Sequence, residues 1–404
     1  MTEQLELKIP EGINYECSGC GQCCTGWTVP MTAADHARVS SVDWGKEEAQ
    51  YTDIKLFRQL KSYEKAGTPY THAILPGSDS FCPFLTDNLC FVHKQYGAKF
   101  KPSMCQLFPY CFNETPSGIY TTVSFVSMAV IYNRGLALTE QRDYLETKLK
   151  EFQALYPNHH PNWSSLQLAV GQPMTWDDYL RHEDKLTNIL KDCSLPLEQR
   201  FLNGSDYLFS QLTAASGSAS GKTFEALPAH TTLKHLDRHL LVALHKIYFP
   251  AKPLGQGECN FNIFRFCYQL AYQGTRISLP TRSFSLEELH EFPWPQADQE
   301  IEDLLFRYFL SRLFGKLYFG AGFGQLSLIT GFHHLILVLA LVKLHAKAWA
   351  ASRQATQVSM LDLVVAIREL EKRLGESKLG GYEAALWELL MQSRSRMRRV
   401  LSFA

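Results

Sequence analysis

The sequence lacks an excess of charge of either sign. Its 404 residues include 40 Lys plus Arg and 40 Asp plus Glu. Because no net field attracts nucleic acid or an anionic membrane, either partner would need a local basic patch. We therefore expect no nucleic-acid partner. The hydrophobic content of 46% is that of an ordinary globular chain and argues against disorder.

A signal peptide and a long uninterrupted apolar run are also missing. The opening residues, MTEQLELKIPEG, have neither the basic nor the apolar segment of a secretory signal. The stretch at residues 326–342 falls short of the roughly eighteen apolar residues of a spanning helix, and its His333 and His334 would be costly in lipid. We predict a cytoplasmic protein with no membrane span, in which residues 326–342 form a buried central helix.

Cysteine, by contrast, is plentiful and unevenly placed among the 11 positions where it occurs. The first quarter of the chain holds Cys17, Cys20, Cys23, Cys24, Cys82, Cys90, Cys105 and Cys111. In a reducing cytoplasm such clustering indicates metal binding rather than disulfides, because thiolates are soft ligands suited to zinc and iron–sulfur centres. Elsewhere Cys193, Cys259 and Cys267 are isolated, and we expect them to be small buried side chains that bind no metal.

The spacing of the clustered cysteines is typical of metal ligands. A Cys-x2-Cys pair such as Cys17 and Cys20 lets two thiolates point at one ion. The run from Cys17 to Cys23 also matches the first three ligands of a bacterial ferredoxin-type cluster, which favours four-iron coordination over zinc. We expect thiols from both halves of the region to converge on one centre. The candidate metal ligands are Cys17, Cys20, Cys23, Cys24, Cys82, Cys90, His93, Cys105 and Cys111.

These candidates exceed the four ligands of a single closed zinc site. Either the region holds two sites, or some of the thiols are spectators. Cys23 and Cys24 are alternatives for one ligand position. His93 is either a ligand or a surface histidine, and Cys111 follows the main motif.

Helical periodicity dominates outside the cysteine segments. One helical insertion begins at Thr32 and extends to about Lys65. Further along, capping signatures at Thr139, Thr175 and Ser285 predict the starts of three more helices. Glycine and proline punctuate the rest of the first quarter, so we expect loops there.

The predicted architecture is therefore mostly α. A loop-rich cysteine module, which holds a metal or an iron–sulfur cluster, covers residues 1–125 and packs on a larger helical region, residues 126–404. A flexible loop of small residues is expected near residues 214–221.

Three other motifs have simple structural interpretations. FGAGFG, residues 319–324, mimics a nucleotide-binding glycine loop, but it follows a helical stretch and is predicted to be a turn between helices. HLDRH places His235 and His239 one turn apart, and we expect a solvated or core pair rather than a metal site. The run SRSRMRR, residues 393–399, is predicted to be a solvated helix end.

Two segments together resemble a known family. Residues 15–27 and 81–109 follow the pattern of the zinc- or iron-chelating cysteine-cluster family: Cys-x2-Cys-x2-Cys-Cys, then Cys-Pro-Phe-Leu with a later Cys and His, then Pro-x2-Cys-x3-Pro. In this chain the pattern is carried by Cys17, Cys20, Cys23, Cys24, Cys82, Pro83, Phe84, Leu85, Cys90, His93, Pro102, Cys105 and Pro109. A cysteine module followed by a long helical region is similar in layout to the flagellin lysine N-methylases of that family.

This resemblance implies an enzyme that transfers methyl from S-adenosylmethionine to lysines of a protein substrate such as flagellin. Such transfer needs a neutral lysine amine and aromatic faces around the cation, and Trp27, beside the first cysteines, is the aromatic candidate for cofactor binding. Methylase-like members have Arg near the position of Gln106. No catalytic residue can be assigned. The alternative hypothesis is a non-catalytic zinc- or iron-binding protein whose helices form an interaction surface.

Overall fold

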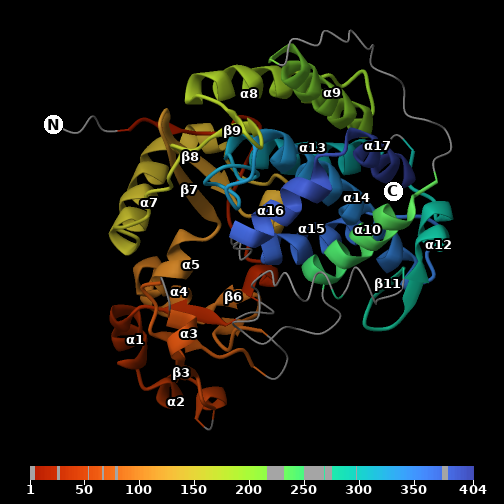
Figure 1. Ribbon diagram of the computed structural model, residues 1–404. Helices are drawn as coiled ribbons and strands as arrows, with labels where there is room; N and C mark the ends of the chain where they lie inside the picture. Colours follow the sequence, from red (N-terminus) through yellow and green to blue (C-terminus); the bar gives the residue numbers. More distant parts are fainter. Residues whose placement is uncertain are drawn as a thin grey trace. The chain divides into compact units, whose positions relative to one another are not determined.

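The computed structural model describes ten parts of the chain: residues 5–24, 28–52, 54–65, 68–77, 81–215, 232–249, 268, 275–296, 298–374 and 381–404. The chain divides into two compact units. The first unit consists of Met1–Phe112 and Ile119–His160, and the second of Asn113–Gly118 and Pro161–Ala404. Helix predominates over strand in the described residues, which confirms the mostly α class (Figure 1).

Short elements make up the first unit. Its strands are β1 Leu7–Lys8, β2 Val29–Met31, β3 Phe57–Gln59, β4 His72–Ile74, β5 Leu85–Thr86, β6 Leu89–Cys90, β7 Tyr110–Thr115 and β8 Gly118–Val123. Its α-helices are α1 Ala33–Ser40, α2 Trp44–Glu47, α3 Ser62–Lys65, α4 Phe91–Tyr96, α5 Ser103–Leu107, α6 Met128–Ile131 and α7 Arg142–Leu155. Its 3₁₀ helices are η1 Gln22–Cys24, η2 Ala49–Tyr51, η3 Ala98–Phe100 and η4 Leu138–Gln141.

Three small sheets organise these elements. Strands β2 and β3 both pair antiparallel with β4, β5 pairs with β6, and β8 lies between β7 and the parallel strand β1. The predicted cap at Thr32 is confirmed, because its side chain accepts a hydrogen bond from the Asp35 N–H and Asp35 caps the Thr32 N–H in return. The helical insertion ends sooner than predicted, since Phe57–Gln59 pairs with β4 and its backbone bonds are satisfied by the sheet.

An aromatic core holds the first part of this unit together. The Trp44 ring lies 4.6 Å from the Phe84 ring, and its Nε1 donates to the Val39 carbonyl at 2.9 Å. Cys82 and Cys90 pack against the same core while remaining only partly buried. The candidate ligands of the hairpin segment are therefore anchored on packed side chains rather than on free loops.

The first unit extends beyond the predicted module of residues 1–125. The ring of Phe152 on α7 lies 5.5 Å from Phe112, and the Tyr156 hydroxyl lies 2.5 Å from that of Tyr70. These aromatic contacts give residues up to His160 their partners within the first unit. The predicted cap at Thr139 is wrong, because that residue lies inside η4 and α7 begins at Arg142 without a side-chain cap.

Longer helices make up the second unit. These are α8 Trp176–Leu190, α9 Leu197–Ala215, α10 His235–Tyr248, α12 Leu286–Glu291, α13 Gln299–Phe314, α14 Leu328–Ser352, α15 Met360–Leu374, α16 Gly381–Met391 and α17 Arg394–Phe403. Two small hairpins accompany them, β9 Gln167–Ala169 with β10 Gln172–Pro173, and β11 Arg276–Ser278 with β12 Ser283–Ser285.

The sequence signatures of this unit are largely confirmed. Capping boxes form at Thr175 with Asp178 and at Ser285 with Glu288. Residues 319–324 form the predicted turn between α13 and α14; a Cβ at Gly322 would lie 1.7 Å from the Lys316 carbonyl oxygen, so the turn requires glycine there. Of the predicted loop at residues 214–221, the first two residues end α9 and the others lie outside the described residues.

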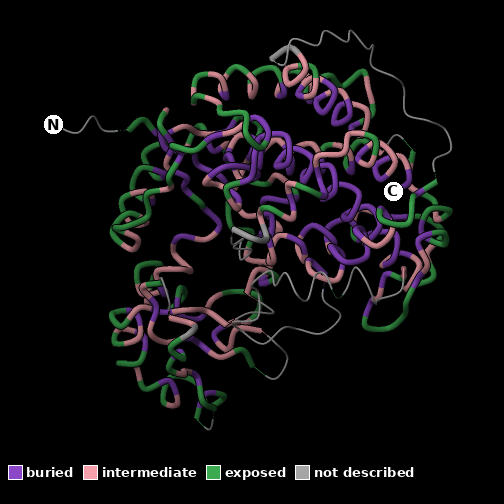
Figure 2. The backbone as a smooth tube through the Cα atoms, in the orientation of Figure 1, coloured by how far each residue is buried: buried purple, intermediate pink, exposed green. Residues whose placement is uncertain are grey.

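Helix α14 is the predicted buried central helix. It packs against α9, α10, α15, α16 and α17, and Figure 2 shows its backbone as a buried segment. Within the described parts of the chain it is the one helix long and apolar enough to cross a membrane, and its apolar window is fully buried inside the protein. Two of its imidazoles bond to other helices: His333 Nε2 lies 2.7 Å from Ser205 Oγ, and His334 Nε2 lies 2.8 Å from the Tyr248 hydroxyl, while His334 Nδ1 has no hydrogen-bond partner among the described residues.

Candidate metal centre

A tight hairpin fixes two of the candidate thiols. Cys82 precedes β5, and Cys90 ends β6 directly opposite Leu85. The two residues that join the strands, Asp87 and Asn88, have φ angles of 50° and 63°, as a two-residue hairpin turn of matching twist requires. Cys82 and Cys90 therefore flank one rigid hairpin.

The first cysteine run docks against this hairpin through its backbone. The Cys82 N–H donates to the Cys24 carbonyl at 2.7 Å, and the Cys24 N–H donates to the Gly21 carbonyl at 2.9 Å. Gly21 has a φ of 69°, and a Cβ there would lie 3.0 Å from the Leu85 side chain. Glycine thus lets the loop approach the hairpin closely enough to bring Cys24 beside Cys82.

Helix α5 contributes a fourth thiol, that of Cys105. Burial raises the pKa of the Cys105 thiol to about 12, and the Cys90 and Cys24 sulfurs raise it further against an opposing effect of Lys101. Burial likewise raises the pKa of Cys24 to about 11, with contributions from Cys23 and Cys90. The pKa of the Cys82 thiol is also raised, mainly by burial and then by Cys105, Cys24 and Cys90. The free thiols of Cys24, Cys82, Cys90 and Cys105 therefore share one electrostatic neighbourhood.

Two positive influences act on these sulfurs. The charge of Lys101 lowers the pKa of both Cys24 and Cys105, and a hydrogen bond from the Phe84 backbone N–H lowers that of Cys82. Lys101 is held by its carbonyl, which accepts from Arg38 Nη2 at 3.0 Å and from Gln106 Nε2 at 2.6 Å. The Gln106 side chain thus holds the backbone of a neighbouring cation in place. Nothing in the spacing of the cysteines pointed to Lys101.

A buried carboxylate positions α5, and sequence reasoning identified it only as a helix cap. Asp35 is 1% exposed, and its Oδ1 accepts from Arg38 at 2.5 Å and from Ser103 Oγ at 2.9 Å. Asp35 lies on α1, and Ser103 begins α5, two residues before Cys105. These hydrogen bonds therefore join α1 to the helix that carries a candidate ligand.

The chemistry of this donor set fits zinc or iron, because thiolates are the ligands that both ions accept in tetrahedral and iron–sulfur sites. The distances fall short of the prediction: across the described residues, no three Cys, His, Asp or Glu side chains form a group that could hold a metal ion. Coordination at about 2.3 Å supplies an attraction that draws sulfurs together. Packing of neutral thiols supplies no comparable attraction.

The other candidates lie in more open surroundings. Cys17 is exposed, Cys20 and Cys23 are partly buried, and His93 is exposed on α4. The Tyr15 pKa is raised by burial and then by Cys17, Tyr110 and Cys23, so Tyr15 lies beside the first cysteines. Trp27, the aromatic candidate for the cofactor, lies outside the described residues.

Cysteines away from the hairpin differ from these four thiols. Cys111 is exposed on β7, with its sulfur 3.9 Å from the Pro109 carbonyl oxygen. Cys193 is exposed as well, so the expectation of a small buried side chain is wrong there, because the residue lies in a turn after α8 rather than on a helix face. Cys259 and Cys267 lie outside the described residues.

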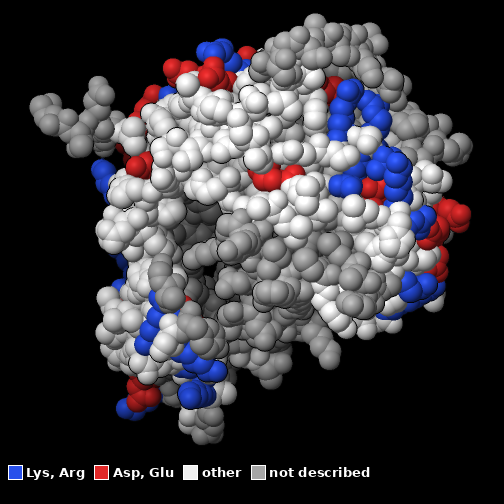
Figure 3. All heavy atoms as spheres, viewed as in Figure 1, with Lys and Arg blue, Asp and Glu red and all other residues white. Residues whose placement is uncertain are grey.

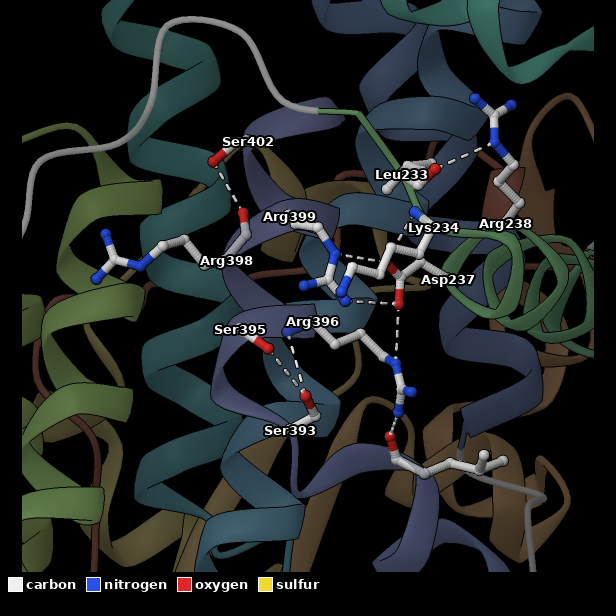
Figure 4. A network of polar contacts seen from close by, with 11 residues as sticks. Leu233, Lys234, Asp237, Arg238, Ser393, Ser395, Arg396, Arg398, Arg399 and Ser402 are labelled. Carbon is white, nitrogen blue, oxygen red and sulfur yellow. Dashed lines mark hydrogen bonds and ion pairs between the residues drawn. The ribbon is translucent and has the colours of Figure 1, made fainter.

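The arginine-rich run is not the solvated helix end that its sequence predicts. Arg396 and Arg399 of α17 reach Asp237 at 2.9 and 2.6 Å, and Asp237 is 1% exposed (Figure 4). Arg394 and Arg398 pair with Asp206 in the same way. On the face shown in Figure 3, Lys and Arg atoms form small separate groups rather than one continuous basic field.

The two neighbouring histidines of HLDRH form a local pair. His235 Nε2 lies 3.1 Å from His239 Nε2, near the start of α10. The acidic residue between them, Asp237, is occupied by the arginines of α17, so these imidazoles gain no carboxylate ligand from it. The interpretation as a simple histidine pair is therefore consistent with the geometry.

Comparison with known proteins places the family resemblance in the first part of the chain. Residues 16–125 match the family CxxCxxCC, described as "Putative zinc- or iron-chelating domain". An uncharacterized protein of Methanocaldococcus jannaschii is 30% identical over 102 residues, which are 25% of this chain and 30% of that protein. No solved structure matches the chain. The region that contains Cys24, Cys82, Cys90 and Cys105 is therefore the part of the molecule that resembles a zinc- or iron-chelating domain.

Proposed function

We propose that the first unit binds zinc or iron through the thiols of Cys24, Cys82, Cys90 and Cys105. The observation that carries this proposal is that three segments, distant in sequence, bring these thiols close enough for neighbouring cysteines of the group to raise the pKa of Cys24, Cys82 and Cys105. Thiols that disfavour each other's ionisation are stabilised as thiolates by a shared cation. Lys101 and the Phe84 N–H add to the same preference for negative charge on sulfur.

The thiols lie on or beside very short helices and strands. Helix α5 has five residues, and β5 and β6 have two each. In such a unit the free energy of metal binding contributes directly to folding. Bound zinc would supply a structural crosslink, and a bound iron–sulfur cluster would add electron-transfer chemistry.

Of the two metals, we propose an iron–sulfur centre of the four-iron kind. The support is the run Cys17, Cys20 and Cys23, whose spacing matches ferredoxin ligands and which lies next to Cys24. The test is anaerobic purification followed by absorption spectroscopy and metal analysis. Broad absorption near about 400 nm with iron and acid-labile sulfide is the expected result. A colourless protein with stoichiometric zinc would exclude the cluster and retain the metal site.

A second proposal is that the chain is a cytoplasmic lysine N-methylase that uses S-adenosylmethionine. It is supported by the resemblance of the cysteine pattern and by an aromatic group in the second unit. The partly exposed Trp176 ring lies 5.3 Å from the Trp163 ring and 5.1 Å from the Tyr179 ring. Such faces suit a lysine side chain near a sulfonium methyl.

Radiolabelled S-adenosylmethionine incubated with the metal-loaded protein and purified flagellin tests this activity. Label on flagellin lysines, lost in the Trp176→Ala variant, is the expected result. A metal-loaded, folded protein that transfers no label to flagellin or to a lysate would leave the interaction-module hypothesis in its place.

A further inference from the structure

Helix α17 has an apolar inner side and a polar outer side. It packs against α14, α9 and α10, and its inward side chains are apolar and buried: Met397, Val400 and Leu401. Because an α-helix turns by about 100° per residue, the opposite side of α17 carries four polar residues, which we call its outer face: Ser395, Arg398, Arg399 and Ser402. By the same periodicity, Arg394 and Arg396 lie at the two edges of this face.

At one edge, the carboxylate of Asp237 is fully occupied. Its Oδ1 accepts from Arg396 Nε at 2.9 Å and from Arg399 Nη2 at 3.2 Å (Figure 4). Its Oδ2 accepts from Arg399 Nε at 2.6 Å and from the Lys234 N–H at 3.1 Å. Neither Arg396 nor Arg399 pairs with a second carboxylate among the described residues. The exposed Lys234 side chain adds an ammonium that has no ion pair in the described ranges.

At the other edge, Asp206 of α9 is shared in the same way. Arg394 and Arg398 both pair with it, and its side chain is 5% exposed. A link between α17 and a neighbouring helix needs one guanidinium per carboxylate, and a second guanidinium adds repulsion between like charges. Within the described residues, the two carboxylates therefore compensate half of the charge of the four arginines.

We propose that the outer face of α17 binds an acidic segment of a partner protein. Arginine presents paired N–H donors that match the two oxygens of an Asp or Glu carboxylate. The side chains of Arg394, Arg398 and Arg399 are partly exposed, so they can reach such a partner. Asp206 and Asp237 already hold these arginines in place, which reduces the entropy that is lost on binding.

The pattern of charge favours an acidic protein over a nucleic acid. Figure 3 shows Lys and Arg atoms gathered over the position of α17 and separated from the other basic groups on this side. A protein that binds duplex DNA neutralises roughly six to ten phosphates along a continuous track. Here Asp206 and Asp237 lie within the basic group, and Glu287 pairs with Arg238 beside it. Closely spaced phosphates would meet these carboxylates, whereas a peptide can place its acidic side chains between them.

Fluorescence anisotropy of a labelled oligoglutamate peptide, titrated with the full-length protein, measures the affinity. Ser395 is the position to vary, because it is exposed on the outer face and its hydroxyl contacts Ser393 rather than either carboxylate. Ser395→Glu should weaken binding by about fivefold or more, and Ser395→Lys should strengthen it by a similar factor. Ser395→Gln is the uncharged control and should leave the affinity unchanged.

The variant Lys234→Glu, at the exposed start of α10, supplies an independent measurement and should also weaken binding. Equal affinity in the Glu, Gln and Lys variants of Ser395 would place the peptide elsewhere and overturn the proposal. Absence of binding to the parent chain at about millimolar peptide would overturn it as well. Tighter binding of an oligothymidine of equal charge would assign the face to nucleic acid. Displacement of the peptide by inorganic phosphate at about millimolar concentration would assign it to a small anion, and either result contradicts the proposal.

Discussion

The two units differ in the partners of their buried ionisable groups. In the second unit, charges in the interior are paired, as in Lys316 with Glu183 and Arg312 with Glu371. In the first unit, burial and neighbouring cysteines raise the pKa of Cys24, Cys82 and Cys105, and the main groups outside this cluster that oppose the shift, among those that the structure describes, are Lys101 and the Phe84 N–H. Charges such as those of Lys316 and Arg312 are thus neutralised by partners within the chain, whereas the clustered thiols of the first unit would gain from a bound cation.

The largest expected effect is that of removing one thiol from the first unit. Cys82→Ser is expected to abolish metal binding and to expose the first unit to protease, because metal binding contributes on the order of 10 kcal/mol to folding in small zinc domains. The second unit should stay resistant. Metal analysis and limited proteolysis measure both effects, with Cys193→Ser as the control. Equal metal loss in the Cys193 variant would show that the two units are not independent in this respect.

In the second unit, removal of one buried carboxylate should cause the corresponding loss of stability. Asp237→Asn leaves Arg396 and Arg399 without their partner, and breaking a buried pair in this way typically costs about 3–5 kcal/mol. Urea unfolding followed by circular dichroism measures the loss, and metal content should not change. Asp177→Asn, at an exposed position on α8, should fall within about 0.5 kcal/mol of the parent chain.

Lowering the pH should release the metal from the first unit before it unfolds the second unit. Burial raises the pKa of Asp237, but hydrogen bonds from Arg399, Lys234 and Arg396 lower it overall. Its stabilisation is therefore present above the unfolded value of about 3.9 and is lost as pH falls through the lower folded pKa. Metal binding by thiols of raised pKa releases protons, so affinity should fall by about tenfold or more per pH unit well above pH 4.

A titration of metal content and helicity from pH 8 to pH 2 checks this order. Metal loss is expected first and loss of helical signal last. Coincident transitions would mean that the units unfold together, and would remove the distinction between them.

The smallest expected effect concerns Lys101, whose charge acts on two of the thiols. Lys101→Gln removes the charge that lowers the pKa of Cys24 and Cys105, and should weaken metal affinity by about two- to tenfold without unfolding the unit. Competition with a chromophoric chelator measures the affinity. Lys99→Gln, two residues away and exposed, is the control and should leave it unchanged.

Local features of the fold were predictable from the sequence because their causes lie within a few residues. The capping boxes at Thr32, Thr175 and Ser285, the turn at residues 319–324 and the buried helix α14 all follow from short patterns. The cysteine pattern likewise located the candidate metal region.

Features that depend on distant partners were missed. Asp35 positions α5 through Ser103, 68 residues away, and Arg396 finds Asp237 across 159 residues. No local pattern carries such information, so the run SRSRMRR was interpreted as a solvated helix end. The end of the first unit at His160 escaped prediction for the same reason, since contacts such as Tyr70 with Tyr156 define it.

The hairpin of β7 and β8 has a consequence for biosynthesis. Its tip, Asn113–Gly118, belongs to the second unit, although β7 begins and β8 ends in the first. The Asn113 amide donates to the Gly315 carbonyl at 2.8 Å, across 202 residues. At ribosomal rates of about 5–20 residues per second, that acceptor emerges on the order of ten seconds or more after the tip. Throughout that interval the nascent chain carries a polar hairpin tip whose bonding partner has not yet been translated.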